Sequence, residues 1–287
     1  MDVDAAAAVI AGRLHRTPTL SSETLGRAFG GRAFLKAELF QKTGSFKPRG
    51  ILARLASLSP EERERGVISV SAGNAAQAVA WGCGLDGIEC LVVMWADASR
   101  QKIAATRAYG AAVDLEAVDK LRAFDRVDEL RRATGRTLVH PYDDPVLIAG
   151  HATLGREIVE ELPDVNVVLV PVGGAGLVAG VATGVRERRH EARVIGVEPE
   201  RSAALHEALE AGKPVLVDPD SIADALSAPV AGEHGLRVCR ELGVESLLVS
   251  EGEIGDGFRF LYERAKLAAE PGAAVGVAAL LADRVPE

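Results

Sequence analysis

Lys47 has the local sequence in this 287-residue chain that best suits covalent chemistry. In the segment Thr43-Gly44-Ser45-Phe46-Lys47, Gly44 permits a sharp turn and Ser45 can cap a helix that begins near Lys47. A lysine in a first helical turn lies beside the positive end of the helix dipole, which favours the neutral amine needed for imine formation. The same sequence also describes a surface lysine after a capping serine, and spacing alone favours that second interpretation.

A second polar turn, Ser71-Ala72-Gly73-Asn74, follows a strand-like run and precedes a helical stretch. Free backbone N–H groups at such a helix start suit an anion such as a carboxylate. Taken alone, the turn is also explained by Ser71 or Asn74 capping the helix.

A third segment, Gly173-Gly174-Ala175-Gly176-Leu177, follows an apolar run and precedes a helix, the layout in which backbone N–H groups cradle phosphate. Residues 174–179 also fit the dinucleotide fingerprint, and Glu198 ends the next strand roughly 20 residues on, where a ribose-binding acid should stand. A nicotinamide oxidoreductase is therefore an alternative. Against it, that fingerprint normally lies in the first βαβ unit, whereas here a full α/β set precedes it.

Short apolar runs alternate with helical stretches around these three segments. The expected strands cover residues 66–70, 90–95, 112–115, 137–140, 167–172 and 193–197, and the expected helices cover 75–85, 99–109, 120–134, 146–162 and a stretch ending at 189. Continuous apolar strands separated by helices indicate parallel sheets covered on both faces. We expect two α/β units with a cleft between them, and a crossing near residues 142–145.

The composition excludes several classes of protein. Hydrophobic residues make up 48% and charged residues 26% of the chain, as in ordinary soluble domains. The net charge of −8 argues against nucleic acid as a partner. No apolar run is long enough to span a membrane, and we expect no signal peptide. Three cysteines without C-x-x-C spacing suggest buried reduced thiols, so we expect a cytoplasmic protein.

The lysine segment, continued by Arg49-Gly50, resembles the signature of fold-type II pyridoxal-phosphate enzymes, and it is most similar to the threonine/serine dehydratase and serine racemase family. Other motifs of that family are matched in the same order: Ser71 to Asn74 with Gln77, Pro171 to Leu177, Gly196-Val197-Glu198-Pro199, Ile222-Ala223-Asp224 and Glu270-Pro271. The resemblance implies two three-layer α/β domains with mainly parallel sheets and an active site in the cleft between them. Residues 1–51 and 142–287 would form the large cofactor-binding domain, and residues 52–141 the small domain.

The resemblance also implies residue roles. Lys47 would hold pyridoxal 5'-phosphate as an imine and then act as the general base at the substrate Cα. Asn74 would reach the phenolic oxygen of the cofactor. The implied cofactor-binding residues are Phe46, Lys47, Asn74, Gly173, Gly174, Ala175, Gly176, Leu177 and Glu270, and the implied substrate-binding residues are Ser71, Ala72, Gly73, Asn74 and Ala75. The expected reaction eliminates the β-hydroxyl of L-threonine or L-serine and gives a 2-oxo acid and ammonia.

Ala72 separates elimination from racemisation within this family. Racemases carry a serine at this position as a second acid/base, whereas alanine cannot carry a proton. Elimination is therefore favoured over a serine or amino-acid racemase. Ala75 stands where the family usually has histidine, which leaves another β-hydroxy amino acid open as the substrate.

Other departures concern the metal and the terminus. Glu198 matches one ligand of the family's cation site, but Ala204 replaces the aspartate, so we expect no metal there. The family's final Ser-Gly-Gly-Asn-like turn, whose serine meets the pyridine nitrogen, is absent before Glu287; either the sequence is truncated or another group takes that place. This departure keeps open a non-catalytic binding protein of the same fold. We assign His140 and His151 core or surface roles, and we expect a homodimer or higher homo-oligomer.

Overall fold

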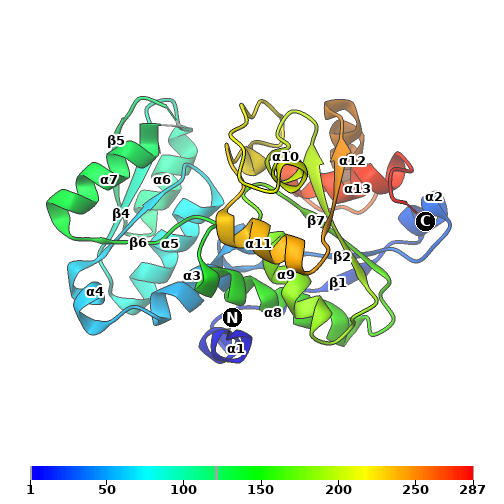
Figure 1. Ribbon diagram of the computed structural model, residues 1–287, viewed down its shortest axis with the longest axis horizontal. Helices are drawn as coiled ribbons and strands as arrows, with labels where there is room; N and C mark the ends of the chain where they lie inside the picture. The colour runs from blue at the N-terminus through cyan, green and yellow to red at the C-terminus, as the bar shows by residue number, and fades with distance from the viewer. Residues whose placement is uncertain (1, 120–121, 287) are drawn as a thin grey trace. The chain divides into compact units, whose positions relative to one another are not determined.

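The computed structural model describes residues 2–119 and 122–286, and the chain divides into two compact units (Figure 1). Unit 1 comprises Met1–His15 and Gln41–Gly150, and unit 2 comprises Arg16–Phe40 and His151–Glu287. The expected domain boundaries after residues 51 and 141 stay a prediction.

Unit 1 is built on a four-stranded parallel sheet with the order β5-β4-β3-β6. Its strands are β3 (Val67–Val70), β4 (Cys90–Trp95), β5 (Ala112–Ala117) and β6 (Thr137–Leu138). Its helices are α1 (Val3–Ile10), α3 (Lys47–Ala56), α4 (Pro60–Arg65), α5 (Asn74–Asp86), α6 (Arg100–Ala108) and α7 (Arg122–Thr134), with the 3-10 turn η2 (Lys42–Gly44). Helix α8 (Pro145–Glu161) begins in unit 1 and ends in unit 2.

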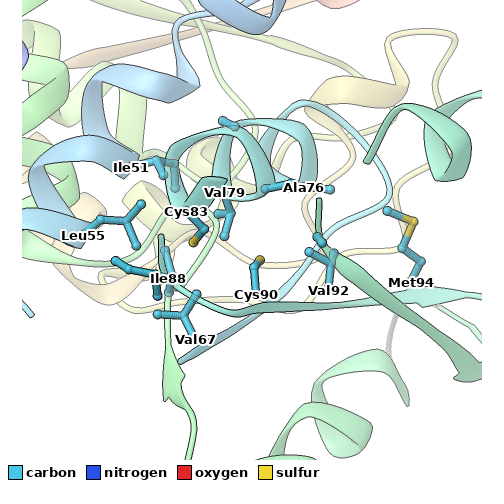
Figure 2. Close-up of a cluster of buried hydrophobic side chains, with 14 of the residues drawn as sticks. Ile51, Leu55, Val67, Ala76, Val79, Cys83, Ile88, Cys90, Val92 and Met94 are labelled. Atoms are coloured by element: carbon cyan, nitrogen blue, oxygen red, sulfur yellow. The ribbon is translucent and has the colours of Figure 1, made fainter. Parts of the chain in front are cut away.

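Helices cover both faces of the unit 1 sheet, as its continuous apolar strands require. Figure 2 shows α5 and α3 packed over β3 and β4, with side chains that include Ile51, Leu55, Val79, Cys83 and Val92. The other face is covered by α7, through Ala123 and Val127. All three cysteines are buried and free, in agreement with their spacing.

Unit 2 contains a three-stranded parallel sheet with the order β7-β8-β9 and an antiparallel β1–β2 pair. Its strands are β1 (Thr19–Ser21), β2 (Phe34–Lys36), β7 (Val167–Pro171), β8 (Arg193–Pro199) and β9 (Glu245–Val249). Its helices are α2 (Glu23–Phe29), α9 (Gly176–Arg186), α10 (Ala204–Ala211), α11 (Glu233–Glu241), α12 (Glu251–Glu263) and α13 (Val275–Leu281), with the 3-10 turns η1 (Glu38–Phe40), η3 (Asp224–Leu226) and η4 (Pro271–Ala274).

The core of unit 2 lies on both sides of this sheet. Helices α12 and α13 contribute Ile254, Val275 and Ala278 to a cluster that also contains Val197 of β8. Helix α9 packs against β7 and β8. Mainly parallel sheets with helices packed on them place the protein in the α/β class, which confirms the expected fold class.

The expected elements differ from the observed ones mainly at their ends. The helix expected to end at residue 189 stops at Arg186, and the start expected at residue 120 lies outside the described residues. Strands β1 and β9 have no counterpart among the expected strands, and helices α1, α2 and α10 to α13 have none among the expected helices. Across the described residues, no helix is both long and apolar enough to cross a membrane.

Candidate active site

Lys47 is the first residue of α3, as the spacing predicts. The expected cap by Ser45 is wrong. Phe46 is the N-cap residue and already has helical dihedral angles (φ −62°, ψ −19°), so Ser45 lies one residue too far from the N–H groups that a cap would serve. The buried Ser45 hydroxyl has no hydrogen-bond partner among the described residues. The chain enters the helix through Thr43 and Gly44, both at positive φ (61° and 74°).

The side-chain amine of Lys47 has a defined position. Its Nζ atom donates a hydrogen bond of 2.7 Å to the carbonyl oxygen of Pro141, and it lies 5.2 Å from the centre of the Phe46 ring. The carbonyl oxygen accepts a proton of the amine, and the aromatic face lies within the distance at which a ring attracts a cationic group. The amine is thus held between the Pro141 carbonyl and the Phe46 ring.

Helix α3 is fixed against the start of α8. Arg54 of α3 pairs with Asp144, which caps α8 through the N–H groups of Val146 and Leu147; the Arg54 Nε–Asp144 Oδ2 distance is 3.0 Å. In the first turn of α3 the two helices approach so closely that a Cβ atom on Gly150 would clash with the backbone at Arg49. These contacts fix the position of the turn before α8 relative to Lys47.

The second polar turn joins β3 to α5, at the carboxyl end of the parallel strand. Gly73 is the N-cap residue and offers no side-chain cap, while the Ser71 hydroxyl accepts a hydrogen bond from the Gly73 N–H (3.1 Å). The N-cap residue is therefore neither Ser71 nor Asn74. A helix start at the carboxyl end of a parallel strand is the setting in which an anion can be bound. Ala72 and Ala75 are buried.

The glycine-rich segment joins β7 to α9 in unit 2. Its N-cap residue is Ala175, at φ 69°, and it supplies no capping side chain, so the first N–H groups of α9 are available to an anion. A Cβ atom on Gly173 would lie 3.2 Å from the Leu226 Cα, so the turn is closely packed at this position. Glu270 is exposed and is the N-cap residue of η4.

Glu198 has a structural role that sequence reasoning missed. It is fully buried, and its two carboxylate oxygens accept hydrogen bonds from the N–H groups of Leu205 and His206 at the start of α10 (2.8 and 2.9 Å). Burial raises the pKa of Glu198 to about 7, although these backbone hydrogen bonds oppose the shift. A carboxylate used in this way cannot also bind a ribose, so the dinucleotide fingerprint loses its acidic partner.

The metal prediction remains untested. Ala204, which replaces the aspartate expected at a cation site, is the buried first residue of α10. Within residues 2–119 and 122–286, no group of three or more His, Cys, Asp or Glu side chains could hold a metal ion.

The sequence-derived candidates fall into two groups. Lys47, Phe46 and the turn before α5 belong to unit 1, where η2 packs against α5. The loop before α9, Glu198 and Glu270 belong to unit 2. That the two groups share one ligand stays a prediction. The groups themselves fit pyridoxal phosphate: an amine for its aldehyde, a carboxamide for its phenolic oxygen, and the backbone N–H groups at the start of α9 for its phosphate.

Comparison with protein families is decisive for the class of protein. Residues 10–287 match the family described as pyridoxal-phosphate dependent enzyme. The chain belongs to this family. Its cofactor is therefore pyridoxal phosphate, and the nicotinamide alternative is wrong.

Individual relatives of this pyridoxal-phosphate dependent enzyme are similar over most of its length. The L-threonine ammonia-lyase of Thermotoga maritima is 41% identical over 98% of this chain and 70% of its own, and that of Geobacter sulfurreducens is 40% identical over 96% and 69%. Among solved structures, the T.th. threonine deaminase has a TM-score of 0.92 with 39% identity, covering 99% of this chain and 94% of its own. Maize serine racemase has a TM-score of 0.94 with 32% identity, covering 98% and 86%.

Proposed function

We propose that this protein is an ammonia-lyase that eliminates the β-hydroxyl group of L-threonine or L-serine, yielding a 2-oxo acid and ammonia. The observation that carries the proposal is the similarity to proteins named L-threonine ammonia-lyase. It extends over nearly all of this chain at 40% and 41% identity. The start of α3 supports it, because Lys47 there presents an amine with a fixed acceptor, the Pro141 carbonyl.

Pyridoxal phosphate, when bound, supplies an electron sink that stabilises negative charge at the substrate Cα. In the proposed site Lys47 would hold the cofactor covalently, and Phe46 would contact its ring. The Asn74 carboxamide would bind the phenolic oxygen, the backbone N–H groups of residues 173–177 would bind the phosphate, and Glu270 would also contact the cofactor. The turn of residues 71–75, at the start of α5, would bind the substrate carboxylate.

Lys47 is also the proposed general base. Once released from the cofactor, its Nζ atom takes the proton from the substrate Cα. The ammonium formed in this way is stabilised by the Pro141 carbonyl oxygen, which already accepts a hydrogen bond from Nζ. The residue therefore holds the abstracted proton while the β-hydroxyl leaves.

Ala72 favours elimination over racemisation. Inversion at Cα needs a second group that delivers a proton to the opposite face, and Ala72 has none. The structural similarity to maize serine racemase makes racemisation the second candidate function. A third candidate is the same elimination on another β-hydroxy amino acid, because Ala75 offers no polar group to the substrate.

The remaining parts of the proposal are that the enzyme is cytoplasmic, works as a homodimer or higher homo-oligomer, and requires no metal. The three reduced cysteines and the net charge of −8 support the cytoplasmic assignment and the absence of a nucleic-acid partner.

A product assay tests the proposed reaction. Purified protein supplied with pyridoxal phosphate is incubated with L-threonine, L-serine and bulkier or acidic β-hydroxy amino acids, and ammonia, 2-oxo acid and the D-enantiomer are measured. We expect 2-oxo acid and ammonia in equal amounts and little D-enantiomer. Formation of D-enantiomer as fast as 2-oxo acid would contradict the interpretation of Ala72, and no product from any substrate would contradict the proposed function.

A further inference from the structure

The turn that presents the Pro141 carbonyl to Lys47 is organised by a histidine. His140 directly precedes Pro141, and its Nδ1 atom accepts hydrogen bonds from the N–H groups of Tyr142 (3.3 Å) and Asp143 (2.8 Å). Both hydrogen bonds connect the imidazole to backbone groups that follow Pro141. They therefore fix the conformation of residues 140–143, and with it the orientation of the Pro141 carbonyl. Because an acceptor nitrogen carries no proton, this geometry requires the ring to be unprotonated at Nδ1.

Ring contacts hold the imidazole in this orientation. It stacks on Phe124 of α7 with a centroid separation of 5.5 Å, and the Tyr142 ring meets it edge-on at 4.6 Å. Aromatic pairs of this kind prefer defined offsets, so the ring has little freedom to turn Nδ1 away from the two N–H groups.

The two sides of the turn are also anchored. Val139, just before His140, donates its N–H to Ile68 of β3 and accepts a hydrogen bond from the Ser69 hydroxyl (2.9 and 2.7 Å). Asp144, just after the turn, caps α8 and pairs with Arg54 of α3. With both ends fixed, the hydrogen bonds to the imidazole determine the direction of the carbonyl between them.

We propose that His140 is a positioning residue for Lys47: its Nδ1 atom closes the turn whose Pro141 carbonyl accepts a hydrogen bond from the Lys47 amine. The inference rests on the proposed role of Lys47 as the covalent and basic residue. In this proposal His140 acts on Lys47 through the backbone of the turn.

The consequence is a selective loss of turnover when the acceptor is removed. A base displaced by about 1 Å costs on the order of a hundredfold in rate, because proton transfer needs hydrogen-bond distance. Substrate binding relies on the turn before α5 and changes less. Removing the acceptor should therefore lower kcat about tenfold to a hundredfold and leave KM within about twofold.

Three substitutions of His140 distinguish the effect of losing the hydrogen-bond acceptor from the effect of changing the size of the side chain. In His140→Asn, the amide oxygen takes the place of Nδ1 and can accept the same two N–H groups. In His140→Gln, the acceptor is displaced by one methylene group, and in His140→Leu it is absent. The readouts are kcat, KM and, in the holoenzyme, the rate at which Lys47 is labelled when the cofactor linkage is reduced by borohydride.

We expect His140→Asn to retain kcat and the labelling rate within a few fold, while His140→Gln and His140→Leu lose about tenfold or more in both. Equal losses in the Asn and Gln variants, or no loss in either, would overturn the inference. If His140→Leu does not fold, the Asn and Gln comparison still decides the matter. Absence of label on Lys47 in the wild-type enzyme would instead overturn the proposed function, so the two failures are distinguishable.

Discussion

At the scale of single residues, the setting of Lys47 combines opposing influences. The residue begins α3, and its amine donates a hydrogen bond to the Pro141 carbonyl. In the proposed function that amine both attacks a carbonyl and holds a proton, so the first role uses its place at the helix start and the second uses the carbonyl acceptor. The buried Ser45 hydroxyl beside it does not play the capping role that spacing predicts, because the helix begins at a residue that is already helical.

A second residue pair makes the stability of unit 1 depend on pH. Asp114 of β5 forms a salt bridge with Arg126 of α7 (Nη2–Oδ2 2.8 Å), and both side chains are less than one fifth exposed. Burial raises the pKa of Asp114, but the hydrogen bonds from Arg126 and from the Glu116 N–H outweigh it, and the net pKa lies below its usual value. The lowered pKa means that the pair stabilises the fold above about pH 4 and loses this effect as the pH falls through the folded-state pKa.

We therefore expect Asp114→Asn to lower the free energy of unfolding by about 1 kcal/mol at pH 7, and the difference from wild type to shrink towards zero near pH 2. Urea unfolding followed by circular dichroism measures both. Asp128→Asn is the matched control, since Asp128 pairs with Arg131 on the exposed face of α7 and should change little at either pH. A constant difference from pH 7 to pH 2 would show that the Asp114 carboxylate is not the stabilising group.

At the scale of elements, close helix crossings hold the site-bearing segments of each unit. In unit 2, α9 carries the glycine-rich turn at its start and crosses α8 through Gly184 and Gly155. A Cβ atom on either glycine would overlap the carbonyl oxygen of the opposite helix, at Ala152 or Val181. The crossing therefore depends on the absence of side chains at these two positions.

Gly184→Ala should accordingly destabilise the protein by about 3 kcal/mol or more, because backbone on both sides must move. Gly255→Ala is the control, since Gly255 also lies within a helix, α12, but no neighbouring atom of the described residues comes within 4 Å of its Cβ position. That change should leave the stability unaltered or raise it by up to about 1 kcal/mol. Chemical denaturation of the two variants compares them directly, and equal stabilities would contradict the close-crossing account.

At the scale of the whole molecule, the sequence predicts the parts that follow from periodicity and chain order. Apolar runs such as 90–95 and 167–172 specify buried parallel strands, and the structure has strands there. The antiparallel β1–β2 pair could not be predicted, because three-residue strands carry no periodic signal.

Particular side-chain contacts could not be predicted from the sequence either. The capping of α10 by Glu198 joins residues seven and eight positions apart across a loop, and the Lys47–Pro141 hydrogen bond spans 94 residues. The sequence predicts a core or surface role for His140, because none of the residues next to it in the chain indicates that its ring accepts hydrogen bonds within a turn. The one available signal was its place at the carboxyl end of a parallel strand, where functional groups of α/β proteins gather.

The central claim is that Lys47 holds the cofactor, and one measurement tests it most directly. The purified protein with pyridoxal phosphate is reduced with borohydride, digested, and searched by mass spectrometry for the lysine that carries the reduced cofactor. We predict that the label lies on Lys47, disappears in Lys47→Ala and persists in Lys42→Ala, which changes the neighbouring lysine in η2. A label on another lysine, or no label in the wild-type protein, would contradict the account.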